Sequence, residues 1–193
     1  MKFLDALLGR SRPAQPKLDA LFGVTGAAIT LESAAGMRPT GQAAVCFKPA
    51  SGQGFAAASE ELKGLLDLAV TEAGSKLAVT DDRYGYRWVV VTDPDMEDLV
   101  TSVHLVNSTL EQHGFGPQLL CSVFGFRDGG STPGQRFYLV YLYKRGSFYP
   151  FAPLEGERRD NELELRVKAA LGGDLPVEAE LARWFALWGI PLD

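Results

Sequence analysis

The chain has 193 residues, of which 46% are hydrophobic, 10% aromatic and 22% charged. These proportions are typical of a soluble globular protein with a buried core, and they exclude a disordered tail, a fibrous repeat and a disulfide-stapled miniprotein. The net charge of −5 comes from 19 basic and 24 acidic side chains. A nucleic-acid-binding function is therefore not expected, since such proteins carry a broad basic surface.

The first 16 residues are predicted to form an arm separate from a single α+β domain at 17–193. Residues 1–9 place Phe3, Leu4, Leu7 and Leu8 at helical spacing, which predicts a short amphipathic helix. Two prolines in the linker at 11–16 prevent that helix from continuing. Residues 1–17 carry a net charge of +3 and the remainder −8, so a basic arm precedes an acidic body.

Neither a leader peptide nor a membrane-spanning helix is expected. Asp5 interrupts the first apolar stretch, and Arg10 and Arg12 follow it. No window approaches the ~20 apolar residues that a transmembrane helix needs. Cys46 and Cys121 lie within apolar runs and in no metal-binding spacing, which favours buried thiols over reactive ones without excluding a disulfide. We expect a cytoplasmic protein. Peripheral contact with the inner face of the cell membrane is compatible with this expectation.

The body is predicted to repeat a unit of two strands followed by a helix. The hairpins pair 27–33 with 42–48, 76–81 with 86–92, and 118–127 with 136–145, and the helices cover 54–70, 96–113, 160–171 and 177–188. A helical turn at 18–22 precedes them, and a looser stretch follows residue 146. This order predicts an α+β fold, an antiparallel sheet of successive hairpins with helices on one face. The order of elements is also similar to that of YbjN and type III secretion chaperones.

The sequence carries no recognisable catalytic or cofactor motif. It lacks a phosphate-binding loop, a dinucleotide fingerprint and a nucleophile elbow. His104 and His113 lie two and a half turns apart on one predicted helix, too far to share a ligand. We therefore expect no enzyme activity, metal or cofactor, and an enzyme or small-ligand site of unrecognised type stays as an alternative.

An aromatic strand and the residues after it form one candidate partner or ligand surface. Along 137–143 both alternating faces are apolar, which predicts a central strand whose second face is either core or a binding surface. The basic and aromatic residues that follow it predict an aromatic lid over the core. The candidate residues are Tyr138, Tyr141, Tyr143, Arg145, Phe148 and Tyr149.

The amphipathic arm is the second candidate contact. Its apolar face and basic flanks suit either an anionic membrane surface or the groove of a partner protein. The sequence leaves both alternatives open. The candidate residues are Phe3, Leu4, Leu7, Leu8, Arg10 and Arg12.

Several stretches together resemble the PspAB family of PspA-associated proteins. They are FLDALLGRSRPAQPKLDALF, RPTGQAAVCFKPA, YGYRWVVV, LVNSTLEQHGFGPQLLCSVFGFRDG, LVYLYKRGSFYPFAP and GERRDNELEL followed by LARWF. They occur in the same order across nearly the whole chain. The resemblance rests on distinctive sequence stretches and includes no catalytic motif, so it assigns no site residue.

The resemblance implies an accessory role beside PspA, the membrane-remodelling protein of the phage-shock envelope-stress response. We accordingly expect a non-enzymatic adaptor that binds a PspA-like coiled-coil protein or another phage-shock accessory protein. A membrane-surface sensor acting through the arm is the alternative function. A homodimer through the sheet face or an edge strand is compatible with this architecture.

Overall fold

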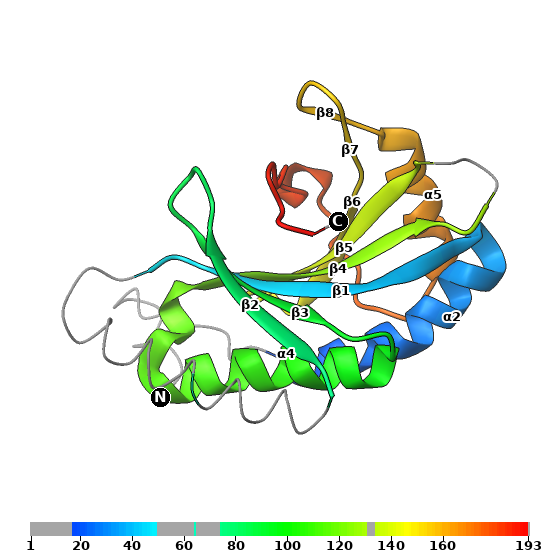
Figure 1. The fold of residues 1–193 in the computed structure, drawn as a ribbon. Helices are drawn as coiled ribbons and strands as arrows, with labels where there is room; N and C mark the ends of the chain where they lie inside the picture. The colour runs from blue at the N-terminus through cyan, green and yellow to red at the C-terminus, as the bar shows by residue number, and fades with distance from the viewer. Residues whose placement is uncertain (1–16, 50–63, 65–73, 131–133, 193) are drawn as a thin grey trace, which may run out of the picture.

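A six-stranded antiparallel sheet forms the centre of the computed structural model, which describes residues 17–49, 64, 74–130 and 134–192 (Figure 1). The strands lie in the order β2-β3-β1-β4-β5-β6. Their bounds are β1 Met37–Phe47, β2 Lys76–Asp81, β3 Arg87–Thr92, β4 Leu119–Asp128, β5 Arg136–Leu142 and β6 Ser147–Phe151. A small ribbon of β7 (Pro153–Leu154) and β8 (Arg158–Arg159) follows.

The three α-helices of the described chain contribute to one core cluster against one face of the sheet. They are α2 (Gly23–Ala35), α4 (Met96–Leu110) and α5 (Asn161–Leu171), and short helical turns lie at Leu18–Phe22, Glu111–Phe115, Gly116–Gln118 and Leu181–Arg183. Figure 1 shows α2 and α4 below the sheet and the C-terminal segment on its opposite side. The predicted α+β class, with an antiparallel sheet and helices on one face, is confirmed.

Two of the three predicted hairpins are confirmed. β2 pairs with β3 from Lys76 opposite Thr92 to Asp81 opposite Arg87, and β4 pairs with β5 along its length. The turn between β2 and β3 is held by Asp82, whose carboxylate accepts hydrogen bonds from two backbone amides of the turn at 2.8 and 2.9 Å. Such a local acceptor specifies a tight turn from sequence alone.

The first predicted hairpin is wrong, because residues 27–33 belong to helix α2. Val24, Ala27, Ala28 and Leu31 recur at helical spacing and are all buried in the core. Gly36 ends this helix in the left-handed conformation, with φ 67°. The strand predicted at 42–48 overlaps β1 over residues 42–47, and β1 pairs with β3 and β4 at the centre of the sheet.

The C-terminal helix predicted at 177–188 is also wrong. This segment is largely extended and contains one short helical turn at Leu181–Arg183. Its start pairs with the edge strand β6, where the Phe148 amide donates to Pro176 O at 2.9 Å and the Glu178 amide donates to Phe148 O at 2.7 Å. Strand β6 itself falls in the stretch predicted to be looser, so the sheet has six strands but not the six that were predicted.

The two faces of the sheet pack differently. Phe137, Leu139 and Tyr141 of β5 lie in the core with the helices, whereas Tyr138 and Val140 face the C-terminal segment. This alternation confirms the predicted central strand with two apolar faces. We call the side without helices the open face of the sheet.

One helical stretch, residues 18–35, is long and apolar enough to span a membrane by length and composition alone, contrary to the expectation from the sequence. Leu21, Val24 and Leu31 of this stretch are completely buried in the core, whereas Phe22 and Ile29 are exposed. The predicted helices at 1–9 and 54–70 lie outside the described residues, apart from residue 64 of the second.

Candidate functional site

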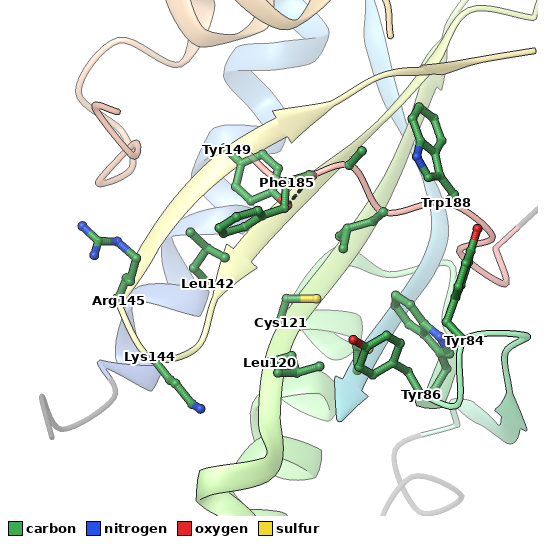
Figure 2. Close-up of a pocket in the computed structure, with 14 residues that line it drawn as sticks. Tyr84, Tyr86, Leu120, Cys121, Leu142, Lys144, Arg145, Tyr149, Phe185 and Trp188 are labelled. Carbon is green, nitrogen blue, oxygen red and sulfur yellow. Dashed lines mark hydrogen bonds between the residues drawn. The ribbon is translucent and has the colours of Figure 1, made fainter. Parts of the chain in front are cut away.

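An apolar pocket of about 730 Å³ lies on the open face of the sheet (Figure 2). It is bounded by the β2–β3 hairpin on one side and by the C-terminal segment on the other. Its aromatic lining consists of Tyr84, Tyr86, Trp88, Tyr149, Phe185 and Trp188, and its aliphatic lining includes Leu120, Leu142 and Leu187. A concave apolar surface of this size is typical of a binding site.

The β2–β3 hairpin holds Trp88 rigidly in the pocket wall. The indole Nε1 of Trp88 donates to Asp82 Oδ2 at 2.9 Å, and the same carboxylate caps the turn. Partial burial by itself would raise the pKa of Asp82, but the hydrogen bonds from Trp88 and the turn amides outweigh it and lower the pKa. A charged Asp82 therefore fixes both the turn and the indole at neutral pH.

The C-terminal segment forms the opposite wall through aromatic contacts with β6. The Tyr149 hydroxyl donates to Phe185 O at 2.9 Å, and its ring stacks on Trp184 with centroids 6.0 Å apart. Phe151 meets the edge of Trp188 at 5.2 Å. Burial raises the pKa of Tyr149, so this phenol stays protonated and acts as a donor.

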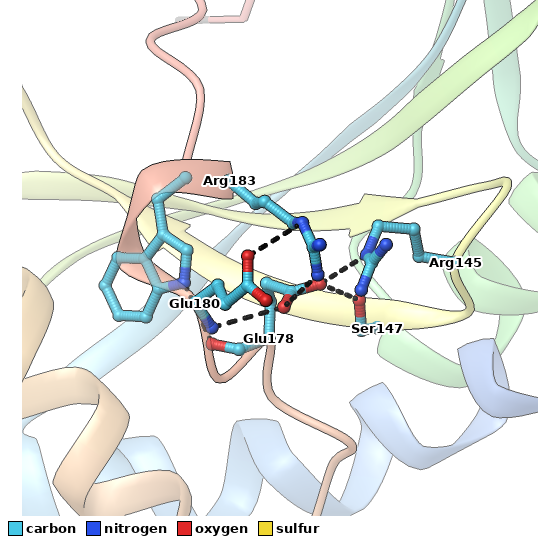
Figure 3. Close-up of polar contacts among 6 residues, drawn as sticks. Arg145, Ser147, Glu178, Glu180 and Arg183 are labelled. Atoms are coloured by element: carbon cyan, nitrogen blue, oxygen red, sulfur yellow. Dashed lines mark hydrogen bonds and ion pairs between the residues drawn. The ribbon is translucent and has the colours of Figure 1, made fainter.

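Glu178 fastens the start of this wall to the sheet (Figure 3). Its carboxylate accepts hydrogen bonds from Arg145 Nε, from Ser147 Oγ at 3.2 Å and from the Glu180 amide at 3.2 Å. Its backbone oxygen accepts a hydrogen bond from Trp184 Nε1 at 3.0 Å. The C-terminal segment is thus a fixed part of the pocket.

Arg159 provides a second anchor for the same wall. Its guanidinium donates to both carboxylate oxygens of Glu164 in α5, at 2.9 and 3.0 Å, and also to Trp184 O. Glu164 is buried and also accepts from the Ala152 amide at 2.9 Å. The guanidinium lies over the ring of Phe151 at 5.2 Å. This network links α5, β6 and the C-terminal segment.

Two free thiols form part of the pocket floor. Cys46 of β1 and Cys121 of β4 are both buried, as the sequence predicted, and the structure makes them register partners, a pairing that the sequence did not predict. A hydrogen bond with Cys121, followed by burial, raises the pKa of the Cys46 thiol. A protonated thiol is a weak nucleophile, so this pair contributes packing surface and little reactivity.

The rim of the pocket carries positive charge at the turn between β5 and β6. Lys144 is exposed and has no carboxylate partner among the residues that the structure describes. Arg145, beside it, is turned toward Glu178. The site therefore places an apolar floor beside the exposed ammonium group of Lys144.

The structure divides the predicted aromatic surface between the two faces of the sheet. Tyr149 and Arg145 line the pocket, and Tyr138 lies on the same face, where its hydroxyl donates to Leu192 O at 3.4 Å. Tyr141, Tyr143 and Phe148 are buried on the face covered by helices. The candidate arm residues Phe3, Leu4, Leu7, Leu8, Arg10 and Arg12 lie outside the described residues.

Sequence reasoning missed most of the pocket lining. Trp88 and Leu120 belong to strands separated in sequence, and only the order of strands in the sheet brings them together. Phe185 and Trp188 were assigned to a helix. They lie three residues apart, which is a helical spacing, so the sequence carried no local signal for an extended segment. Within the described part of the chain, no group of three or more His, Cys, Asp or Glu side chains is arranged to hold a metal.

Comparison with known proteins gives a family but no close relative of known structure. No curated protein and no solved structure matches the chain. The expected likeness to YbjN and type III secretion chaperones therefore stays a prediction. The family model for PspAB, described as PspA associated protein B, matches residues 1–192. Because this match covers essentially the whole chain, the protein belongs to the PspAB family.

Proposed function

We propose that this protein is a non-enzymatic accessory protein of the PspA system that binds a helical partner in the apolar pocket. The family description supports an association with PspA. The observation that carries the proposal is the uncovered, largely apolar hollow of about 730 Å³ between the β2–β3 hairpin and the C-terminal segment. Tyr84 and Phe185 are 50% and 56% exposed at this hollow, and clustered exposed apolar side chains are typical of a binding surface.

An amphipathic helix suits the form and chemistry of this pocket. Such a helix presents apolar side chains at every third or fourth position, which a groove lined by Trp88, Leu142 and Phe185 would bury. The exposed ammonium group of Lys144 would meet an acidic side chain beside that apolar stripe. A coiled-coil protein that exposes one helix offers both features.

The chemistry of the lining supports a binding role over a catalytic one. The pKa of Cys46 is raised by its hydrogen bond with Cys121 and by burial, and the pKa of Tyr149 is raised by burial. The guanidinium of Arg145 is already paired with Glu178. These groups hold the pocket together, whereas a catalytic site needs a base or nucleophile activated by its surroundings.

Titration with purified PspA from the same organism tests this proposal. Trp88 and Trp188 line the pocket, so their fluorescence reports its occupation directly. Two variants, Phe185→Ser and Lys144→Glu, should each weaken binding about tenfold or more, as expected for an anchor residue and for a reversed charge. Phe185 is 56% exposed, so its replacement should not unfold the domain.

Ile29→Ser is the matched control for the apolar substitution. Ile29 is 70% exposed and lies on α2, on the other side of the sheet. This variant should bind PspA as tightly as the unaltered protein. Equal affinity for all four proteins, or loss of binding in the Ile29 variant alone, would overturn the assignment of the pocket.

The N-terminal arm provides the alternative contact and can be tested separately. Leu4→Glu with Leu7→Glu removes its apolar face and leaves the described pocket residues unchanged. If the arm binds the membrane, this double variant should lose binding to anionic vesicles and keep its affinity for PspA. Loss of PspA binding in this variant, with binding kept in the pocket variants, would move the partner site to the arm.

A further inference from the structure

A row of arginines crosses three neighbouring strands at one end of the sheet. Arg38 of β1 lies opposite Arg127 of β4, and Arg127 lies opposite Arg136 of β5. Register partners in an antiparallel sheet project from the same face with Cβ atoms about 5 Å apart. Like charges placed directly opposite one another oppose folding. This arrangement therefore indicates a compensating negative charge.

The described residues supply only part of that compensation. Arg38 pairs with Glu32 of α2 at 2.9 Å. Arg127 and Arg136 are exposed, and neither forms an ion pair with a described residue. Asp128 also lines the hollow that these two arginines border, but no ion pair joins it to either of them. Within the described residues, both guanidinium groups therefore lack an ion-pair partner.

The two arginines border a hollow of about 350 Å³ that is distinct from the apolar pocket. Gly125 and Thr40 also line it. The Thr40 hydroxyl oxygen lies 2.5 Å from where a Cβ atom on residue 125 would be, so it occupies the space left by the glycine. This oxygen is buried and has no hydrogen-bond partner among the described residues. Among the described residues, the hollow thus combines two guanidinium groups that form no ion pair and a hydroxyl that has no hydrogen-bond partner.

We propose that this hollow binds the phosphate group of a small ligand, with Arg127 and Arg136 as its main contacts. The planar guanidinium fork matches two phosphate oxygens, and two neighbouring forks would neutralise a doubly charged phosphate monoester. The ligand class is a phosphate monoester, either free in solution or as a lipid headgroup. This site is independent of the proposed partner pocket, so each stands if the other fails.

Calorimetric titration of the full chain with glycerol 3-phosphate, at constant ionic strength, tests the site. Glycerol is the uncharged control ligand. Arg127→Gln and Arg136→Gln should each weaken phosphate binding about tenfold or more, because each removes a charge-assisted hydrogen-bond donor. Arg158→Gln removes the same charge from an exposed arginine elsewhere and should leave binding unchanged.

Thermal unfolding shows that a loss of binding is not a loss of fold. Without ligand, Arg127→Gln should melt no lower than the unaltered protein, since it relieves repulsion with two neighbouring arginines. Glycerol 3-phosphate should raise the melting temperature of the unaltered protein and not that of this variant. If Arg127→Gln without ligand melts well below the unaltered protein, the row of arginines has a structural role, and the proposal is overturned.

Vesicles distinguish the two sources of phosphate. Binding to vesicles that contain phosphatidic acid, lost in Arg127→Gln and absent with phosphatidylcholine alone, identifies a lipid headgroup. Binding of glycerol 3-phosphate alone identifies a soluble ligand. Binding of neither overturns the proposal.

Discussion

Replacing Glu178 by Gln should destabilise the protein by loosening the C-terminal wall of the apolar pocket. The side chain of Glu178 is 5% exposed and accepts hydrogen bonds from Arg145, Ser147 and the Glu180 amide. Gln keeps the size of the side chain but removes its charge. One of its two terminal atoms also becomes a donor facing groups that are themselves donors.

The expected loss follows from how exposed the partners are. Removing one member of a fully buried ion pair costs about 3–5 kcal/mol. Arg145 is 43% exposed, so solvent screens part of its attraction and the remaining cost comes mainly from the charge-assisted hydrogen bonds. We expect a loss of about 2–3 kcal/mol in the free energy of unfolding. For a chain of this length that corresponds to roughly 5–10 °C in melting temperature.

The same reasoning predicts how the loss depends on pH. Burial by itself would raise the pKa of Glu178, but the hydrogen bonds from Arg145, the Glu180 amide and Ser147 outweigh it and lower the pKa below the ordinary value of 4.5. A lowered pKa in the folded state contributes stability that is complete above 4.5 and is lost as the pH falls through the lowered value. The difference between the two proteins should therefore be full at pH 7 and shrink below 4.5.

Urea denaturation of both proteins between pH 7 and pH 3 measures this difference. Glu180→Gln is the matched control, because Glu180 is 58% exposed and pairs with Arg183 on the surface. That variant should lose no more than about 0.5 kcal/mol. Equal losses in the two variants, or a Glu178 difference that persists unchanged at pH 3, would refute the assignment of Glu178 as a charged anchor.

Three further predictions concern the turns, the caps and the thiols. Gly41→Ala should lower the free energy of unfolding by about 1–3 kcal/mol, because residue 41 has φ 75° and a Cβ atom would lie 3.0 Å from Asp93 O. Urea denaturation measures this loss, and an unchanged midpoint would contradict the prediction. Asp95→Ala removes the acceptor for two amides of the first turn of α4, at 2.8 and 3.2 Å, and should cost about 1 kcal/mol in the same assay. Cys46 and Cys121 should resist alkylation by iodoacetamide at pH 7 in the folded protein and should react in urea. Mass spectrometry detects the label, and rapid labelling without urea would show that the thiols are accessible.

Local sequence signals determined the elements whose stability is decided within a few residues. The Asp82 turn specifies the β2–β3 hairpin through its own hydrogen bonds, and Asp95 marks the start of α4. The apolar alternation along β5 predicted a central strand with two apolar faces. The resemblance across the chain indicated the family, which the family model confirms for residues 1–192.

Position in the sheet decided what local signals left ambiguous. Ile29 and Thr30 favour a strand by propensity, yet they lie in α2, because burying Val24, Ala27 and Leu31 together against the core requires helical spacing. The C-terminal segment has apolar residues near helical spacing. It is extended instead: its start pairs with β6 through two backbone hydrogen bonds, and Trp184 is buried on the open face.

Both candidate sites also exist only in the tertiary structure. The apolar pocket joins Trp88 of β3 to Phe185 of the C-terminal segment, and the arginine row joins three strands whose neighbours are set by the sheet order. No periodicity in the sequence encodes contacts between strands this far apart. The sequence by itself determined which residues are apolar or charged, and strand pairing decided which of them meet, because register is fixed by the packing of the whole sheet.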